Sequence, residues 1–144
     1  MAQKSFTSGN TQSWDEDRLP NTIWFDVRIG RAAEALVHCA NLYKALGVEP
    51  NAHIEMTVRY GGLRGRTLTA ADSWLIDLVA TRKNLYEGEV SIPPITFKLG
   101  AAETEIVLLT KRLCEPLFVI FDYVSLPDDV YQTIIADSVK RRVR

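Results

Sequence analysis

Residues 54–68 decide the fold that we expect, and they read Ile-Glu-Met-Thr-Val-Arg-Tyr-Gly-Gly-Leu-Arg-Gly-Arg-Thr-Leu. From His53 to Tyr60, apolar and polar residues alternate, which is the pattern of a strand with one buried face. Gly61-Gly62 favours a tight turn, because glycine adopts positive φ without a steric penalty. Residues 63–70 then return as an antiparallel partner. The stretch therefore predicts a β-hairpin.

A long helix is predicted directly before this hairpin, from about Arg28 to Leu46. Its apolar residues recur at helical spacing and form one stripe: Ile29, Ala32, Ala33, Leu36, Val37, Ala40 and Tyr43. Gly47 is well placed to end the helix. Before the helix, residues 23–27 alternate like a short strand, and residues 1–20 are polar and predict a flexible arm.

After the hairpin, the pattern predicts more strand and then two helices. Residues 73–80 favour a third strand, with a short helix as the alternative. Residues 90–99 predict a strand that Pro93-Pro94 interrupts, which makes it an edge strand or a bulged one, because proline donates no ladder hydrogen bond.

The C-terminal part predicts a helical pair. One helix begins near Ala101 or Ala102, and Pro116 should kink or break it. The last helix opens at Pro127-Asp128-Asp129. Its apolar face is expected to consist of four residues: Val130, Tyr131, Ile134 and Ile135.

The length and charge of the chain limit the number of domains and the kinds of partner that we expect. The chain has 144 residues, 17 of them basic and 18 acidic, and its formal net charge is −1. This length is that of one domain, and the charge balance gives no general attraction to nucleic acid or membrane. We expect a flexible arm over residues 1–20 and a single α+β domain over residues 21–144.

The cysteines and histidines predict neither a metal site nor a cofactor. Cys39 and Cys114 both lie in apolar helical patterns, which favours reduced, buried thiols in a cytoplasmic protein, while a bridge between them stays open. With His38 and His53 they match no zinc-finger spacing.

The N-terminus does not resemble a signal peptide, and no apolar run approaches the ~20 residues that span a bilayer. We therefore expect no membrane association.

Two groups of basic residues are candidates for contacts with phosphate. Arg59, Arg64 and Arg66 surround the glycines of the predicted hairpin, where guanidinium groups and exposed amides would suit an anion. Lys140, Arg141 and Arg142 form a basic tail that would suit nucleic acid or an acidic partner. The structural alternative for both groups is a set of solvated cations, some of them paired with acids or placed at a helix end.

No catalytic signature occurs in the sequence. It contains no Gly-x-Ser-x-Gly elbow, no phosphate-binding loop and no His-Glu-x-x-His motif. His38 lies on the polar side of the predicted helix and is expected to be solvated. We therefore predict that the chain is not an enzyme.

One resemblance adds to this interpretation. Residues 35–48, followed by Gly61-Gly62-Leu63-Arg64-Gly65-Arg66-Thr67-Leu68, resemble the C-terminal portion of bacterial Schlafen-like (AlbA-type) DNA-binding or ATP-binding proteins. The stretch from Pro116 to Pro127 is compatible with it. In that family the nucleic-acid or nucleotide function is assigned to an N-terminal domain, and this chain shows no equivalent. The resemblance therefore implies an accessory region and carries over no catalytic residue.

Together these observations predict an α+β fold in which a mostly antiparallel sheet with a β-hairpin packs against one long helix and a C-terminal helical pair. The expected function is that of a non-catalytic accessory or interaction domain in a larger bacterial defence or transcriptional system, with a protein partner or a homo-oligomer. The alternative is a nucleic-acid-binding module that uses the arginine-rich hairpin.

Overall fold

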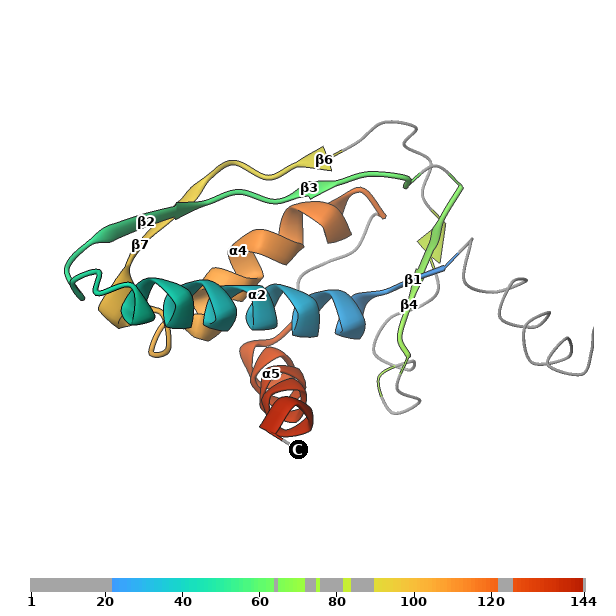
Figure 1. Cartoon of the computed structure of the whole chain (residues 1–144). Coiled ribbons are helices and arrows are strands. Elements are labelled where there is room, and N and C mark those ends of the chain that lie inside the picture. The colour runs from blue at the N-terminus through green and yellow to red at the C-terminus, as the bar shows by residue number, and fades with distance from the viewer. Residues whose placement is uncertain are drawn as a thin grey trace, which may run out of the picture.

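The computed structural model describes residues 22–63, 65–71, 75, 82–83, 90–121 and 126–143. This part of the chain has an α+β fold (Figure 1). Its helices are α2 (Phe25–Ala45), α4 (Ile106–Val119) and α5 (Asp128–Val143), and a short 3-10 helix, η2 (Leu99–Ala101), precedes α4. Its strands are β1 (Thr22–Trp24), β2 (His53–Met56), β3 (Arg59–Tyr60), β4 (Thr67–Thr69), β5 (Arg82–Lys83), β6 (Val90–Ser91) and β7 (Ile95–Lys98).

Helix α2 is the centre of the fold, and its predicted apolar stripe is largely confirmed. Ile29, Ala33 and Leu36 are fully buried, whereas Tyr43 near the C-terminal end is exposed. The helix ends as predicted: Gly47 has a φ of 83°. The Gly47 amide donates to the Lys44 carbonyl and the Val48 amide to the Tyr43 carbonyl, both at 3.0 Å. This pair of bonds is the Schellman arrangement, which satisfies carbonyl groups that the helix end would leave unpaired.

Strands β2 and β3 run beside β7 and β6 as one long antiparallel ribbon over the helices (Figure 1). Met56 lies opposite Ile95 and Arg59 lies opposite Ser91, so the second strand carries one extra residue between these pairs. The extra residue falls at Pro93-Pro94, which makes the predicted bulge. Next to it, the Thr57 hydroxyl donates to the Ile92 carbonyl at 2.6 Å.

The predicted β-hairpin over residues 54–70 is wrong. β2 pairs with β7, whereas β4 pairs in parallel with β1 and antiparallel with β5. The described strands therefore form three small sheets and not one mostly antiparallel sheet. The glycines do turn the chain, because Gly62 and Gly65 have φ values of 66° and 71°. The turn directs the chain towards β1, and alternation along a strand does not reveal which strand it pairs with.

Three local features of the structure also differ from the prediction. The strand expected at residues 23–27 ends at Trp24, because Phe25 and Asp26 are both buried as the first residues of α2. Helix α4 continues through Pro116 to Val119 without the expected break. Leu75, the one described residue of the stretch 73–80, is helical and buried, which goes against the strand. The arm over residues 1–20 lies outside the described residues.

Helix α5 packs across α2 and completes the core. Gly30 allows this crossing, since a Cβ atom there would lie 3.2 Å from the Ser138 hydroxyl oxygen. That hydroxyl donates to the Glu34 carboxylate at 2.8 Å. The apolar face predicted for α5 is confirmed, because Val130, Tyr131, Ile134 and Ile135 are all buried. Buried apolar side chains from all three described helices form one cluster with β2, β4 and β7.

Candidate anion-binding cavity

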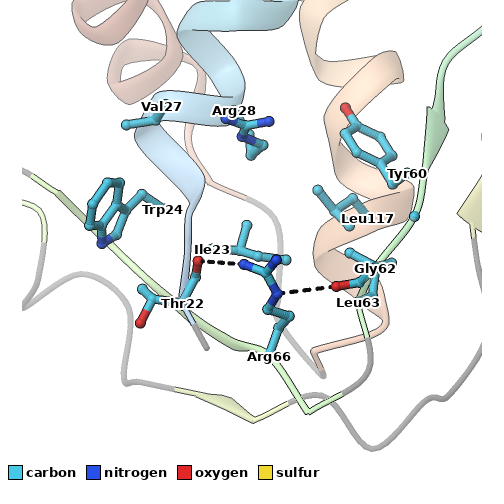
Figure 2. Close-up of a pocket in the computed structure, with 11 residues that line it drawn as sticks. Thr22, Ile23, Trp24, Val27, Arg28, Tyr60, Gly62, Leu63, Arg66 and Leu117 are labelled. Carbon is cyan, nitrogen blue, oxygen red and sulfur yellow. Dashed lines mark hydrogen bonds between the residues drawn. The ribbon is translucent and has the colours of Figure 1, made fainter. Parts of the chain in front are cut away.

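A cavity of about 370 Å³ opens between strand β1, the first turn of α2, the segment after β3, and α4. Figure 2 shows how these segments surround it. Its lining combines two arginines and a glycine pair with aromatic and aliphatic side chains: Thr22, Ile23, Trp24, Val27, Arg28, Tyr60, Gly61, Gly62, Leu63, Arg66 and Leu117. Cavities of this mixed character are typical small-molecule sites.

Arg66 joins two sides of the cavity. Its Nε donates to the Gly62 carbonyl at 3.1 Å and its NH1 group to the Thr22 carbonyl at 3.2 Å (Figure 2). The side chain is half-buried. The guanidinium therefore holds β1 against the loop after β3, and it brings a permanent positive charge to the cavity wall.

Tyr60 connects the strand ribbon to α4, which forms a third side of the cavity. Its hydroxyl donates to the Leu113 carbonyl at 3.0 Å. This carbonyl lies in the helical turn before Pro116, where proline disturbs the regular bonding of the preceding turn. Burial, together with the neighbouring Cys114 thiol, raises the pKa of the Tyr60 hydroxyl above its usual 10.0. Tyr60 is therefore neutral at physiological pH and anchors the ribbon to α4.

Arg28 enters the cavity from the first turns of α2, and Figure 2 shows it between Val27 and Tyr60. Its positive charge opposes the burial that raises the pKa of both Tyr60 and Cys114, which places the guanidinium close to both groups. Among the described residues, no carboxylate forms an ion pair with Arg28. The nearest acid in sequence, Asp26, instead accepts a bond of 2.9 Å from the Ala71 amide.

The chemistry of the lining favours binding over catalysis. Among the described residues that line the cavity there is no aspartate, glutamate, histidine or cysteine. Their polar side chains are two guanidiniums, one neutral phenol, one threonine and the indole of Trp24. Guanidinium groups form strong, charge-assisted hydrogen bonds to carboxylates and phosphates. The cavity therefore has the chemistry of a site for an anion.

The structure separates the basic residues that the sequence singled out. Arg59 is exposed on β3, Arg66 lines the cavity, and Arg64 lies outside the described residues. Lys140 is exposed on α5. Arg141 and Arg142 belong to the last turn of α5, whose C-terminal end lies across α2 from β3 (Figure 1). The exposed side chains of Lys140 and Arg59 thus lie on different elements.

Arg28 is a cavity residue that was not predicted from the sequence, although its position at the start of a helix carried a signal. A cation in the first turns of a helix is disfavoured, because the positive end of the helix dipole lies there. Arg28 occupies such a position, three residues after Phe25, with which the helix starts. An anion bound near Arg28 would neutralise this unfavourable charge, and the structure places Arg28 at a cavity.

The other candidate residues of the sequence lie apart from this site. His38 and His53 are exposed, and Cys39 and Cys114 are both free thiols. In the part of the chain that the structure describes, no three residues of the metal-ligating types come together.

No protein-family profile, no curated protein and no solved structure matches this chain significantly. The described helices include none with the length and apolar character needed to cross a bilayer. The geometry of the cavity and the exposed surface are therefore the observations from which a function can be inferred.

Proposed function

We propose that the chain is a non-catalytic accessory domain that acts by binding, and that the cavity beside α2 takes a small anionic ligand. One observation carries this proposal: Arg28 and Arg66 line a cavity to which the described residues contribute no carboxylate. An anion bound there would form a charge-assisted hydrogen bond with the Arg28 guanidinium. The accessory role is also what the resemblance to Schlafen-like proteins implies.

The nucleic-acid alternative is less well supported. Arg66 was expected to project from a hairpin tip, but its Nε and NH1 atoms bind main-chain carbonyls inside the fold. Arg59 and Lys140 are exposed and lie on different elements. A strand of nucleic acid needs a series of cations along its backbone, and these residues do not provide one among the described side chains.

A titration followed by ¹H–¹⁵N NMR tests the proposal. The probes are sodium phosphate, sodium acetate, sodium benzoate and a mixed single-stranded oligonucleotide, each at matched ionic strength. We expect at least one small anion to shift the amide signals of Gly61 and Gly62 and the indole signal of Trp24 in a saturable way. Arg28→Gln should abolish that saturation. Arg31→Gln is the matched control, because Arg31 is exposed on the same helix and pairs with Glu34.

Two results would count against this function. Shifts that scale only with ionic strength for every small anion would remove the anion site. Saturable shifts with the oligonucleotide alone, weakening steeply with salt, would restore the nucleic-acid alternative.

The accessory role also needs a surface for a partner, and the end of α2 offers one. Leu42 and Leu46 are 49% and 69% exposed, and Tyr43 lies next to Leu42. Residues four apart lie on the same face of a helix, so the two leucines form one exposed apolar strip. We propose that this strip contributes to self-association or to binding of a protein partner. Sedimentation velocity of the parent and of Leu42→Glu/Leu46→Glu tests the homo-oligomer; identical sedimentation of both would remove this part of the proposal.

A further inference from the structure

We infer that the cavity is selective for one class of anion: a small monocarboxylate with a flat apolar body, such as an arylcarboxylate. This inference rests on the proposed function, because it names the ligand of the same site. Three features of the lining carry it: the arrangement of the arginines, the apolar walls and the size of the cavity.

The arginines favour a single carboxylate group. Arg66 already donates through Nε and NH1 to the carbonyls of Gly62 and Thr22, so its planar fork is committed to the protein. Arg28 has no such bond among the described residues, and its fork matches the two oxygens of a carboxylate. A dianionic phosphate needs several strong donors, whereas one fork with a second positive charge nearby suits a group of charge −1.

The walls favour an apolar body behind that carboxylate. Ile23, Tyr60 and Leu117 lie on the same side of the β1–α2 chain as the two arginines and supply the apolar surface beside them, whereas Trp24 and Val27 line the cavity from the other side of that chain (Figure 2). The Tyr60 ring beside two aliphatic side chains is suited to a flat ring, because aromatic groups associate by offset stacking or edge-to-face contact. Burial of the ring against these walls adds a favourable hydrophobic contribution that acetate or inorganic phosphate cannot gain.

The size favours a small molecule. A cavity of about 370 Å³ corresponds to roughly twelve water molecules at ~30 Å³ each. One substituted ring with a carboxylate fits within that space, while a dinucleotide or a peptide of several residues does not. The ends of β1 and the loop after β3, joined by Arg66, close two sides of this volume.

The test compares four probes by isothermal titration calorimetry and NMR: benzoate, acetate, benzamide and inorganic phosphate. We expect benzoate to bind at least about tenfold more tightly than acetate, because its ring adds buried apolar area. We expect benzamide, which has the same shape without the charge, to bind at least about tenfold more weakly than benzoate. Phosphate should bind more weakly than benzoate.

Variants assign these preferences to residues. Ile23→Ala should weaken benzoate binding and leave acetate binding unchanged, because it alters only the apolar wall. Arg28→Lys keeps a positive charge but loses the bidentate fork, and it should weaken both carboxylates. Arg31→Lys serves as the matched control. Retention of the amide spectrum shows that each variant is folded, and the comparison of probes on the parent protein needs no variant.

The outcomes separate this inference from the proposed function. If phosphate or acetate bound as tightly as benzoate, the ligand would not be an arylcarboxylate. The proposal of an anion site would remain. Benzamide equal to benzoate would overturn both, since the site would then recognise only an apolar ring. Absence of saturable binding by all four probes would also overturn both.

Discussion

The two ends of helix α2 are built in opposite ways. The C-terminal end is closed by its own neighbours in sequence, through the bonds of Gly47 and Val48 to Lys44 and Tyr43. The N-terminal end is held by distant segments. Thr22 in β1 pairs with Thr67 in β4, the Ala71 amide donates to Asp26, and the Cys114 thiol donates to the Arg28 carbonyl at 3.9 Å.

This difference explains where the cavity lies. A helix end that closes on itself needs no other segment, and its side chains, such as Leu46, stay exposed. An end that is closed by several distant segments brings their side chains together, and the pieces do not fill all the space between them. The cavity occurs at the second kind of end, where Arg28, Arg66 and Tyr60 come from separate elements.

The largest effect on stability is expected from a substitution at the N-terminal end of α2, which distant segments hold in place. Phe25 is completely buried and packs edge-to-face on Phe118, with ring centroids 6.2 Å apart. Phe25→Ala should lower the free energy of unfolding by about 3–5 kcal/mol, whereas Leu46→Ala at the other end should change it by less than about 0.5 kcal/mol. Urea denaturation followed by circular dichroism measures both. Equal losses would show that the two ends do not differ in this way.

The second largest loss of stability is expected on replacing the buried carboxylate at the same end of α2. Asp26 is only 8% exposed and accepts a hydrogen bond from Ala71. Asp26→Ala should lower the free energy of unfolding by about 1.5–3 kcal/mol, because the Ala71 amide loses its carboxylate acceptor. Asp26→Asn keeps one acceptor oxygen and should lose less. If the asparagine variant were no more stable than the alanine variant, the bond to Ala71 would not be the reason for the loss.

Alkaline pH should weaken the same region. Burial raises the pKa of the Cys114 thiol from 9.0 to about 12. Between these values the unfolded chain releases the thiol proton while the folded chain keeps it, so stability falls as pH rises, by about 1.4 kcal/mol per pH unit. Below pH 9.0 this contribution is fully present.

Chemical denaturation at a series of alkaline pH values measures this slope. Cys114→Ala should reduce it, and the remainder should include Tyr60, whose pKa burial also raises. Tyr60→Phe should remove that part. A slope that Cys114→Ala leaves unchanged would contradict the assignment.

The smallest expected effect concerns the locally closed end. Gly47 has a φ of 83°, which is in the left-handed region. Gly47→Ala should lower the free energy of unfolding by about 1 kcal/mol, because a Cβ atom disfavours that conformation. Gly47→Asn should lower the free energy of unfolding by less, since asparagine tolerates the left-handed conformation better than alanine does. The cavity lies at the other end, so neither variant should change the affinity for benzoate, and a change of several-fold would show that the ends are coupled.

Local signals predicted local features well. Gly47 as the helix end, the bulge at Pro93-Pro94 and the buried face of α5 all depend on residues near one another in sequence. The pairing of β4 was predicted wrongly, because alternation identifies the buried face of a strand but not its partner. The long-range choice between β2 and β1 as neighbours of β4 is decided by packing of the whole core.

The cavity could be predicted only in fragments. Arg66, Tyr60 and Gly61-Gly62 were noted because they are close in sequence, and they were assigned to a hairpin tip. Arg28 and Leu117 join them only once β1 pairs with β4 and Tyr60 reaches α4. A site assembled from four separate segments leaves no spacing motif in the sequence, so its composition had to come from the structure.

The pairing of β1 with β4 has a consequence for synthesis on the ribosome. Thr22 leaves the exit tunnel long before its partner Thr67, and β2 likewise precedes β7. Helix α2 is thus produced with a closed C-terminal end while its other end still lacks every long-range contact. Its apolar stripe stays partly uncovered until α4 and α5 have both been synthesised, so the nascent chain exposes apolar helical surface over that interval.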